Sequence, residues 1–373
     1  MSYKKLLDAS VSTESAQAWR ASGKKAVGTV CCHVPYEVIY AAGILPVRLR
    51  ATNCVDASES EAWMSSFSCS YAKSILQYLM DGTYDLDGLI QTDGCAMPAR
   101  IFDNWEHIAK QRGKAQFTHF VGAPRINKDI TRTYYRSEVQ EMADALGKFS
   151  GTPVTDEGLK AAVAKYNEIR ELVAQLNELR KADNPVITGA EALAIMIKFG
   201  DCTPDEYIGL LKEFLADAKN RKPIEGRTRL MVIGSALDDP GYIKIIEDKG
   251  SLIVTDDFCY GDRHFGGKIE IDDNDVLGSI VDYYLTRDTC PRMLDNRQKM
   301  HDEIIAKVKK YNVKGVVYQK MQNCECWGGE SYYLEPALKE IGVPMLQLER
   351  EQQLANAGQI AVRAEAFMEM LDK

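Results

Sequence analysis

The chain has 373 residues, a formal net charge of −8, 45% hydrophobic residues and 27% charged residues. This length is too great for one ordinary hydrophobic core, so we expect two domains. A net negative charge does not suit a nucleic-acid-binding protein, which needs a basic surface. The sequence has no apolar run of about 18 residues that could span a membrane. No signal-peptide pattern follows the first lysines. We therefore expect a cytoplasmic protein that binds neither nucleic acid nor a membrane.

Strand and helix signals alternate from the start of the first block. Residues 26–30 form a short apolar run that predicts a buried strand, and residues 44–51 predict a second one. Between them, residues 35–43 begin with proline and end with glycine, as a short helix does. A strand, a helix and a strand within so few residues imply a parallel unit.

The same alternation continues through the rest of this block. An amphipathic helix is predicted over 66–82, a strand over 86–91 with a second helix after it, and a further strand over 116–125. Cys69 lies near the start of the first of these helices, and Cys95 lies between the strand 86–91 and the helix that follows. Both cysteines are therefore expected at a boundary between elements.

The middle of the chain contains no strand signal. Apolar residues recur at helical spacing over 155–181, 188–200 and 203–221, and each segment begins with a threonine that can cap a helix. We therefore expect a purely helical connector in this region.

The last block returns to the alternating pattern. We expect strands over 229–235, 251–259, 314–319 and 343–349, and helices over 241–250, 296–313, 331–342 and 359–373. The whole pattern predicts an α/β fold with two doubly wound, mostly parallel-sheet domains joined by a helical connector. The expected boundaries are 1–150 for the N-terminal α/β domain, 151–225 for the connector and 226–373 for the C-terminal α/β domain.

The ten cysteines are the most informative residues for function. In a reducing compartment they are not expected to form disulfides, so each is a packed small residue, a metal ligand or a catalytic thiol. Ligands gather at the carboxyl ends of parallel strands, and Cys95 and Cys324 follow predicted strands while Cys69 opens a neighbouring helix. Helix N-termini favour thiolates, and two facing sheets could bring these three sulfurs together in a cleft.

Three thiolates from separate segments would suit an iron–sulfur cube with one open iron, although a lone cysteine past a strand is more often a packed small residue than a ligand. One member of each close pair, 31–32 and 324–326, is expected to be a bystander, and Cys54 and Cys202 are expected to be incidental. The chain has no CxxC motif for a zinc ribbon, no GxGxxG after a strand, no Walker A sequence and no GxSxG elbow.

With these motifs in place, the sequence resembles the 2-hydroxyacyl-CoA dehydratase and benzoyl-CoA reductase family. The likeness covers nearly the whole chain and is carried by five segments in this order: 23–49, 66–105, 256–265, 290–300 and 313–351. The resemblance implies that three cysteines hold a [4Fe-4S] cluster, and the matching positions here are Cys69, Cys95 and Cys324.

The resemblance also implies partners and a reaction. The chain would be the smaller subunit of a heterodimer with a homologous larger subunit, and an ATP-dependent activator protein with its own iron–sulfur cluster would inject one electron at low potential. The substrate would be an (R)-2-hydroxyacyl-CoA, whose ketyl radical expels the hydroxyl group to yield an enoyl-CoA, which is a lyase reaction. The resemblance identifies neither the acyl group nor a catalytic base.

Two local features qualify this expectation. Glu325 and Cys326 stand after Cys324 where the sequence "FCD" is commoner in the family, so the surroundings of the cluster and the substrate stay open. The carboxylates nearest to the implied sites are Glu37 and Glu330, and both fit equally well as first-turn helix residues favoured by the dipole.

Three other functions stay open. The first is a benzoyl-CoA reductase-type subunit that reduces an aromatic acyl-CoA with the same cluster, and the second is a subunit whose cluster only relays electrons. The third is a low-potential reductase of small molecules, a homodimer that needs no CoA and carries a double-cubane [8Fe-9S] cluster. Its set of ligands would match Cys31, Cys69, Cys95, Cys259, Cys290 and Cys324.

Overall fold

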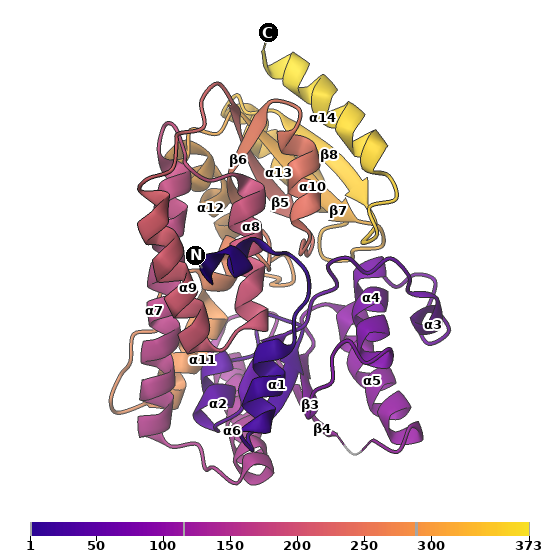
Figure 1. Ribbon diagram of the computed structural model, residues 1–373, viewed down its shortest axis with the longest axis vertical. Helices are drawn as coiled ribbons and strands as arrows, with labels where there is room; N and C mark the ends of the chain where they lie inside the picture. Colours follow the sequence, from indigo (N-terminus) through magenta and orange to yellow (C-terminus); the bar gives the residue numbers. More distant parts are fainter. Residues whose placement is uncertain (1, 115, 288–289, 373) are drawn as a thin grey trace.

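The computed structural model describes residues 2–114, 116–287 and 290–372 and contains two parallel β-sheets (Figure 1). The first sheet has the order β2-β1-β3-β4, with β1 at Ala26–Thr29, β2 at Leu45–Arg48, β3 at Gly88–Thr92 and β4 at Phe117–Val121. The second has the order β6-β5-β7-β8, with β5 at Thr228–Gly234, β6 at Ser251–Asp257, β7 at Gly315–Met321 and β8 at Met345–Arg350. Every paired strand runs parallel to its neighbour, which confirms the predicted fold class.

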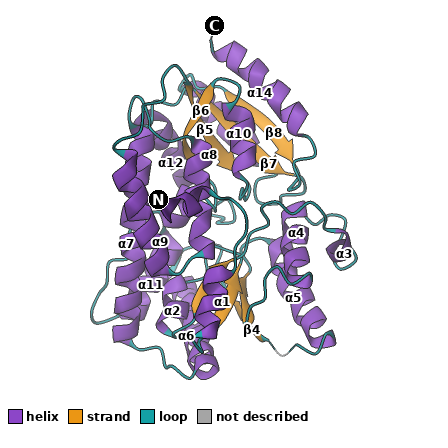
Figure 2. Ribbon diagram, in the orientation of Figure 1, coloured by secondary structure: helices purple, strands orange, loops and turns teal. Residues whose placement is uncertain are grey.

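Helices surround both groups of strands (Figure 2). Those that match the expected helices are α2 (Tyr36–Ala41), α4 (Ser70–Met80), α5 (Ala96–Gln111), α7 (Asp156–Lys181), α8 (Gly189–Lys198), α9 (Pro204–Ala218), α10 (Pro240–Glu247), α12 (Arg297–Lys310), α13 (Glu330–Glu340) and α14 (Ala357–Leu371). Those that the sequence patterns did not indicate are α1 (Glu14–Ala21), α3 (Ser58–Glu61), α6 (Asp129–Ser150), α11 (Val276–Thr286) and the short 3-10 helices η1 (Ser2–Leu7), η2 (Phe199–Asp201) and η3 (Asp262–Phe265).

Both sheets have the same strand order, with the first strand in sequence lying between the second and the third. The winding direction therefore reverses between β1 and β3 in one sheet and between β5 and β7 in the other. In open parallel sheets, ligands bind outside the carboxyl ends of the strands at such a reversal. The topology thus marks the segments after these four strands as the place to look for chemistry.

The helix α7 connects the two halves of the molecule (Figure 1). Its first turn is capped by Thr155, whose hydroxyl oxygen accepts a hydrogen bond from Gly158 N at 3.1 Å, as the Thr-Asp start predicts. Along its length α7 packs against α2 and α11 in one half and against β6 in the other. The expected helical connector is therefore present, and it spans both sheets.

Buried ion pairs fasten this connector to both sheets. Arg170 of α7 pairs with Glu37 of α2, while Arg180 near the other end of α7 pairs with Asp256 of β6 at 2.7 Å. Removing one member of such a pair would leave a buried charge uncompensated, so each pair favours this one arrangement strongly. The connector therefore contacts α2 in one half and β6 in the other through buried ion pairs.

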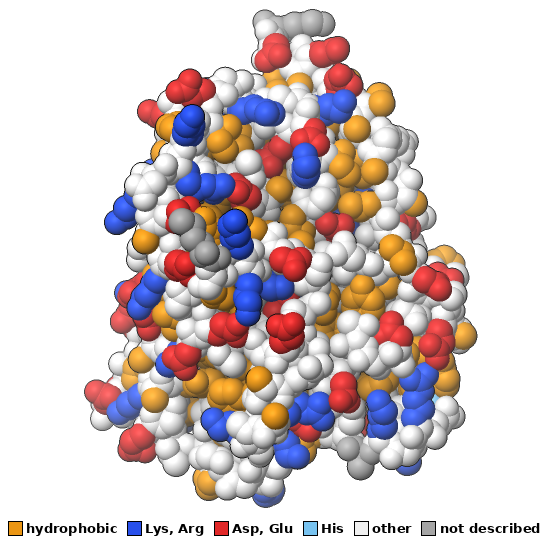
Figure 3. All heavy atoms as spheres, in the orientation of Figure 1, with side chains coloured by type: hydrophobic (Ala, Val, Ile, Leu, Met, Phe, Trp, Pro, Cys, Tyr) orange, Lys and Arg blue, Asp and Glu red, His pale blue; other side chains and the backbone are white. Residues whose placement is uncertain are grey.

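A single apolar cluster extends through both halves and includes Leu89 of β3 with Val232 of β5 and Val317 of β7. Within the described residues, no helix is both long enough and apolar enough to cross a bilayer. On the face of the molecule drawn in Figure 3, acidic and basic side chains are interspersed.

Candidate metal centre

The carboxyl ends of the strands of both sheets converge on one cavity of about 80 Å³. Its wall includes Val30 after β1, Gly94 after β3, Ser235 after β5 and Met321 at the end of β7. One water needs only about 10–15 Å³ of such space, so the cavity has room for a group of several atoms. The site lies where the reversal of strand order in each sheet places a ligand.

Eight of the ten cysteines line this cavity, which we call the cysteine cavity: Cys31, Cys32, Cys69, Cys95, Cys259, Cys290, Cys324 and Cys326. They include the three positions of the expected cube and the three additional positions of the double-cubane alternative. Cys54 and Cys202, which were expected to be incidental, are not among the lining residues; Cys54 contacts the Asp56 carbonyl and Cys202 packs in the connector core.

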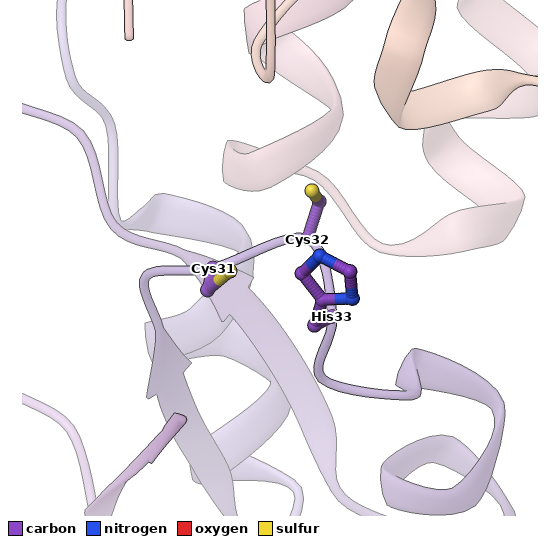
Figure 4. Close-up of side chains that lie close together, drawn as sticks. All are labelled: Cys31, Cys32 and His33. Atoms are coloured by element: carbon purple, nitrogen blue, oxygen red, sulfur yellow. The ribbon is translucent and has the colours of Figure 1, made fainter. Parts of the chain in front are cut away.

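Both members of each close cysteine pair reach the cavity wall, although one unspecified member of each pair was expected to be a bystander. The Sγ atoms of Cys326 and Cys95 lie 3.8 Å apart. Ligand atoms of Cys31, Cys32 and His33 lie within 4.8 Å of one another in the turn after β1 (Figure 4). Sequence spacing could not identify these extra thiols, because both pairs lie in loops whose course depends on the packed fold.

The elements that present Cys69 and Cys95 are helix starts. Cys69 is the N-cap residue of α4 and Cys95 the N-cap residue of α5, each with an extended backbone. Gly94 is required beside Cys95, because a Cβ atom there would lie 2.5 Å from the Sγ atom of Cys31. The turn after β1 and the turn after β3 therefore pack together closely enough to place both sulfurs on one wall.

Residues of the second half hold these helix starts in place. The backbone N–H of Ala96 at the start of α5 donates to the Glu325 carboxylate at 2.7 Å, which links the Cys95 turn to the Cys324–Cys326 loop. At the start of α4, the backbone N–H of Tyr71 contacts the sulfur of Met321 at 3.3 Å. Glu325, which the sequence analysis noted only as a departure from the family pattern, thus caps a helix from across the cavity.

Burial controls the protonation of these thiols. It raises the pKa of Cys69 to about 12 and that of Cys259 to about 11, and it also raises the pKa of Cys324. Burial therefore outweighs the helix N-terminus at Cys69, contrary to the expectation that the helix start alone favours a thiolate. The contact between Cys95 and Cys326 raises the pKa of Cys95 and lowers that of Cys326, so Cys326 ionises first.

The donor set and charges of the cavity fit an iron–sulfur cluster. Thiolates are the ligands of such clusters, and a bound metal displaces the protons that burial keeps on these thiols. Three arginines, Arg48, Arg263 and Arg292, lie in the wall, and Arg263 pairs with Asp257. The Nε atom of Arg48 is buried and has no hydrogen-bond partner among the described residues.

The two carboxylates considered as nearby candidates have structural partners. Glu37 pairs with Arg170 and accepts a hydrogen bond from the Tyr284 hydroxyl at 2.9 Å. Glu330 contacts the ring of His301 at 2.7 Å. Neither residue is among those that line the cysteine cavity, so both match the helix first-turn interpretation better than a catalytic one.

The chain is similar to a known family over nearly its whole length. Residues 31–371 match the family model described as 2-hydroxyglutaryl-CoA dehydratase, D-component. The chain is 26% identical over 363 residues to the β subunit of (R)-2-hydroxyglutaryl-CoA dehydratase of Acidaminococcus fermentans, covering 95% of this chain and 94% of the relative. It is 23% identical to the β subunit of (R)-phenyllactyl-CoA dehydratase of Clostridium sporogenes, covering 94% and 92%.

A subunit of the benzoyl-CoA reductase of Thauera aromatica is also similar, with 23% identity over 93% of this chain and 90% of the relative. A solved structure of a mutant laminin-binding adhesin of Streptococcus agalactiae aligns with 94% of this chain and all of its own at 11% identity, but its TM-score of 0.22 supports no argument. The relatives are components of dehydratases, which are lyases, and of a reductase. The chain belongs to the 2-hydroxyglutaryl-CoA dehydratase D-component family of enzymes.

Proposed function

We propose that the cysteine cavity holds an iron–sulfur centre larger than a single cube and that the chain is the cluster-bearing subunit of a low-potential reductase of small molecules. The observation that carries this proposal is the gathering of eight cysteines on one cavity wall. A single [4Fe-4S] cube takes at most four thiolates, whereas the double-cubane [8Fe-9S] alternative uses more. The proposed ligands are Cys31, Cys69, Cys95, Cys259, Cys290 and Cys324.

These six residues come equally from the two halves of the chain. Cys31, Cys69 and Cys95 precede the connector and the other three follow it, so both halves contribute thiols to the wall of the cavity. Arginines in the wall would offset part of the charge of the thiolates. When bound, the cluster supplies low-potential one-electron transfer to the substrate.

The proposed partners follow from the same proposal. The related chains carry subunit names, which supports assembly with another chain, and we propose a second copy of this one. Electrons would come from an ATP-dependent activator protein with its own iron–sulfur cluster. We place the enzyme in the cytoplasm, because a reducing compartment keeps cysteines available as ligands.

The second candidate is a 2-hydroxyacyl-CoA dehydratase subunit. It is favoured by the two dehydratase β subunits that match this chain over more than nine-tenths of its length. In that case a [4Fe-4S] cube would be held by Cys69, Cys95 and Cys324, the partner would be a larger related subunit, and an (R)-2-hydroxyacyl-CoA would be converted to an enoyl-CoA. A benzoyl-CoA reductase-type subunit would use the same three ligands, and one relative bears that name.

Iron and sulfide analysis of the anaerobically purified chain separates these candidates. We expect about eight irons per chain for the larger centre, against about four for a cube. The variants Cys259→Ser and Cys290→Ser should each lower the iron content, whereas Cys202→Ser, outside the cavity, should not. If the chain holds about four irons and both cavity variants keep them, the reductase proposal is wrong. Formation of enoyl-CoA with the activator would then support the dehydratase.

A further inference from the structure

Arg48 is a buried cation with no carboxylate partner among the described residues. It ends β2, is 3% exposed and lines the cysteine cavity. Its guanidinium lies 4.7 Å from the centre of the Tyr260 ring, and its Nη1 atom donates to the Tyr36 hydroxyl at 3.5 Å. In the part of the chain that the structure describes, its Nε atom has no hydrogen-bond partner. Across the described residues, no carboxylate forms an ion pair with Arg48, so its contacts are a ring face and one long hydrogen bond.

Several other buried arginines of the chain form ion pairs with carboxylates. Arg50 pairs with Asp201 at 2.6 Å, Arg180 with Asp256 at 2.7 Å, and Arg263 with Asp257 at 3.2 Å. Burying a charge without compensation is costly, and these pairs show how the fold usually avoids that cost. Arg350 and Arg229 are also buried and pair with no carboxylate among the described residues, but their guanidinium groups donate to amide and backbone carbonyl oxygens. Arg48, at the wall of the cysteine cavity, has neither a carboxylate nor a carbonyl partner among the described residues.

The groups that face Arg48 identify what its partner must be. Burial lowers the pKa of Arg48, but the surrounding groups raise it by a larger amount, so the guanidinium remains charged. These groups are Tyr36, Tyr260, Cys259 and Cys32. The neighbouring His264 is kept neutral because burial, and then Arg48 itself, lower its pKa well below the usual value. The cavity wall also contains the Glu325 carboxylate, which accepts a hydrogen bond from Ala96 N. The groups around Arg48 that a bound metal would make anionic are thiols.

The position of Arg48 is also fixed by the fold. A Cβ atom on Gly200 of η2 would lie 2.7 Å from the Cβ atom of Arg48 and 2.8 Å from its carbonyl oxygen. The connector therefore packs directly against this residue, and its backbone cannot move toward η2. A charge held in this way acts on the cavity without reorganising.

We propose that Arg48 is a positioning residue that supplies the buried positive charge for the thiolate-ligated cluster and raises its reduction potential. This inference rests on the proposed iron–sulfur site, but it holds for either cluster size. A reduced cluster carries one more negative charge than the oxidised one, so a fixed cation nearby stabilises the reduced form more. Removing the cation should make the cluster harder to reduce.

The test compares the holoproteins of the wild type, Arg48→Met and Arg48→Lys in iron content and in EPR-monitored redox titration. We expect Arg48→Met to shift the midpoint potential downward by at least about 59 mV, a tenfold change in the one-electron equilibrium. Arg48→Lys, which keeps the charge, should recover most of the shift. Loading of iron by Arg48→Lys but not by Arg48→Met would equally support a requirement for the charge.

Two results would overturn the role of Arg48. One is an unchanged potential in a fully loaded Arg48→Met protein, and the other is equal loss of iron in both variants, which would show a need for the guanidinium shape alone. A wild-type chain that binds no iron would instead refute the proposed function. The control is Glu61→Gln, a change on α3 at the surface, which should leave the potential unchanged.

Discussion

The contact between Gly94 and Cys31 predicts the effect of adding one methyl group at the cavity. In Gly94→Ala the new Cβ atom would lie 2.5 Å from the Cys31 Sγ atom and 3.3 Å from its Cβ atom. Ordinary contact between heavy atoms begins at about 3.5 Å, so Cys31 or the turn that carries Cys95 must move by about 1 Å. Gly94 does not have a positive φ, so strain comes from this contact and not from the backbone.

The magnitude follows from two rules. Overpacking of this kind costs about 1–3 kcal/mol, which for a chain of this size lowers Tm by about 1–4 °C. Metal ligands tolerate displacements of only about 0.2 Å, so a shift of about 1 Å removes one proposed ligand from the cluster. The matched control is Gly209→Ala, at an exposed position within α9 where an added Cβ meets nothing within 4 Å. That change should raise helix stability by up to about 1 kcal/mol.

The assay is iron and sulfide content per chain after anaerobic reconstitution, together with thermal unfolding of the same samples. We expect Gly94→Ala to bind less iron than the wild type and Gly209→Ala to bind the same amount. A Gly94→Ala protein with full iron content and the wild-type Tm would refute the reasoning, because it would show that the two turns can separate without affecting the site.

Three further predictions concern titration and buried charge. In the iron-free protein, Cys326 should be alkylated at lower pH than Cys69, whose pKa burial raises to about 12; equal pH profiles by peptide mass spectrometry would contradict this order. His264 has a pKa far below its usual value, so below about pH 6.5 the unfolded chain binds a proton that the folded chain does not. The free energy of unfolding therefore falls by about 1.4 kcal/mol per pH unit as the pH decreases. In denaturant unfolding curves, His264→Gln should remove this contribution. Arg170→Met should cost about 3–5 kcal/mol in such curves, and adding Glu37→Gln should restore part of it; no recovery in the double variant would show that the pair is not coupled.

Much of the fold could be predicted from local patterns. Proline and glycine bound α2, threonines cap α7, α8 and α9, and apolar runs coincide with the eight strands. These signals work because capping, hydrophobic periodicity and turn chemistry depend on residues a few positions apart. The helices α6 and α11 were missed, and their apolar faces pack against each other and against neighbouring elements.

The candidate site was predictable only in part. The positions of Cys69, Cys95 and Cys324 at element boundaries are local facts, and the sequence pattern indicated them. The presence of Cys32 and Cys326 on the same wall was not indicated, because it depends on how two loops separated by nearly 300 residues face each other. The high pKa of Cys69 was likewise missed, since burial is a property of the packed molecule and exceeds the effect of the helix start.

The sequence by itself therefore determined the alternation of strands and helices, the helical connector and the cysteines at element boundaries, all of which follow from short-range chemistry. The tertiary structure alone decided the strand order of each sheet, the gathering of eight thiols around one cavity and the lack of a carboxylate partner for Arg48 among the described residues. The physical reason is that these features depend on distances between residues far apart in the chain, and burial and ion pairing across the two halves set those distances.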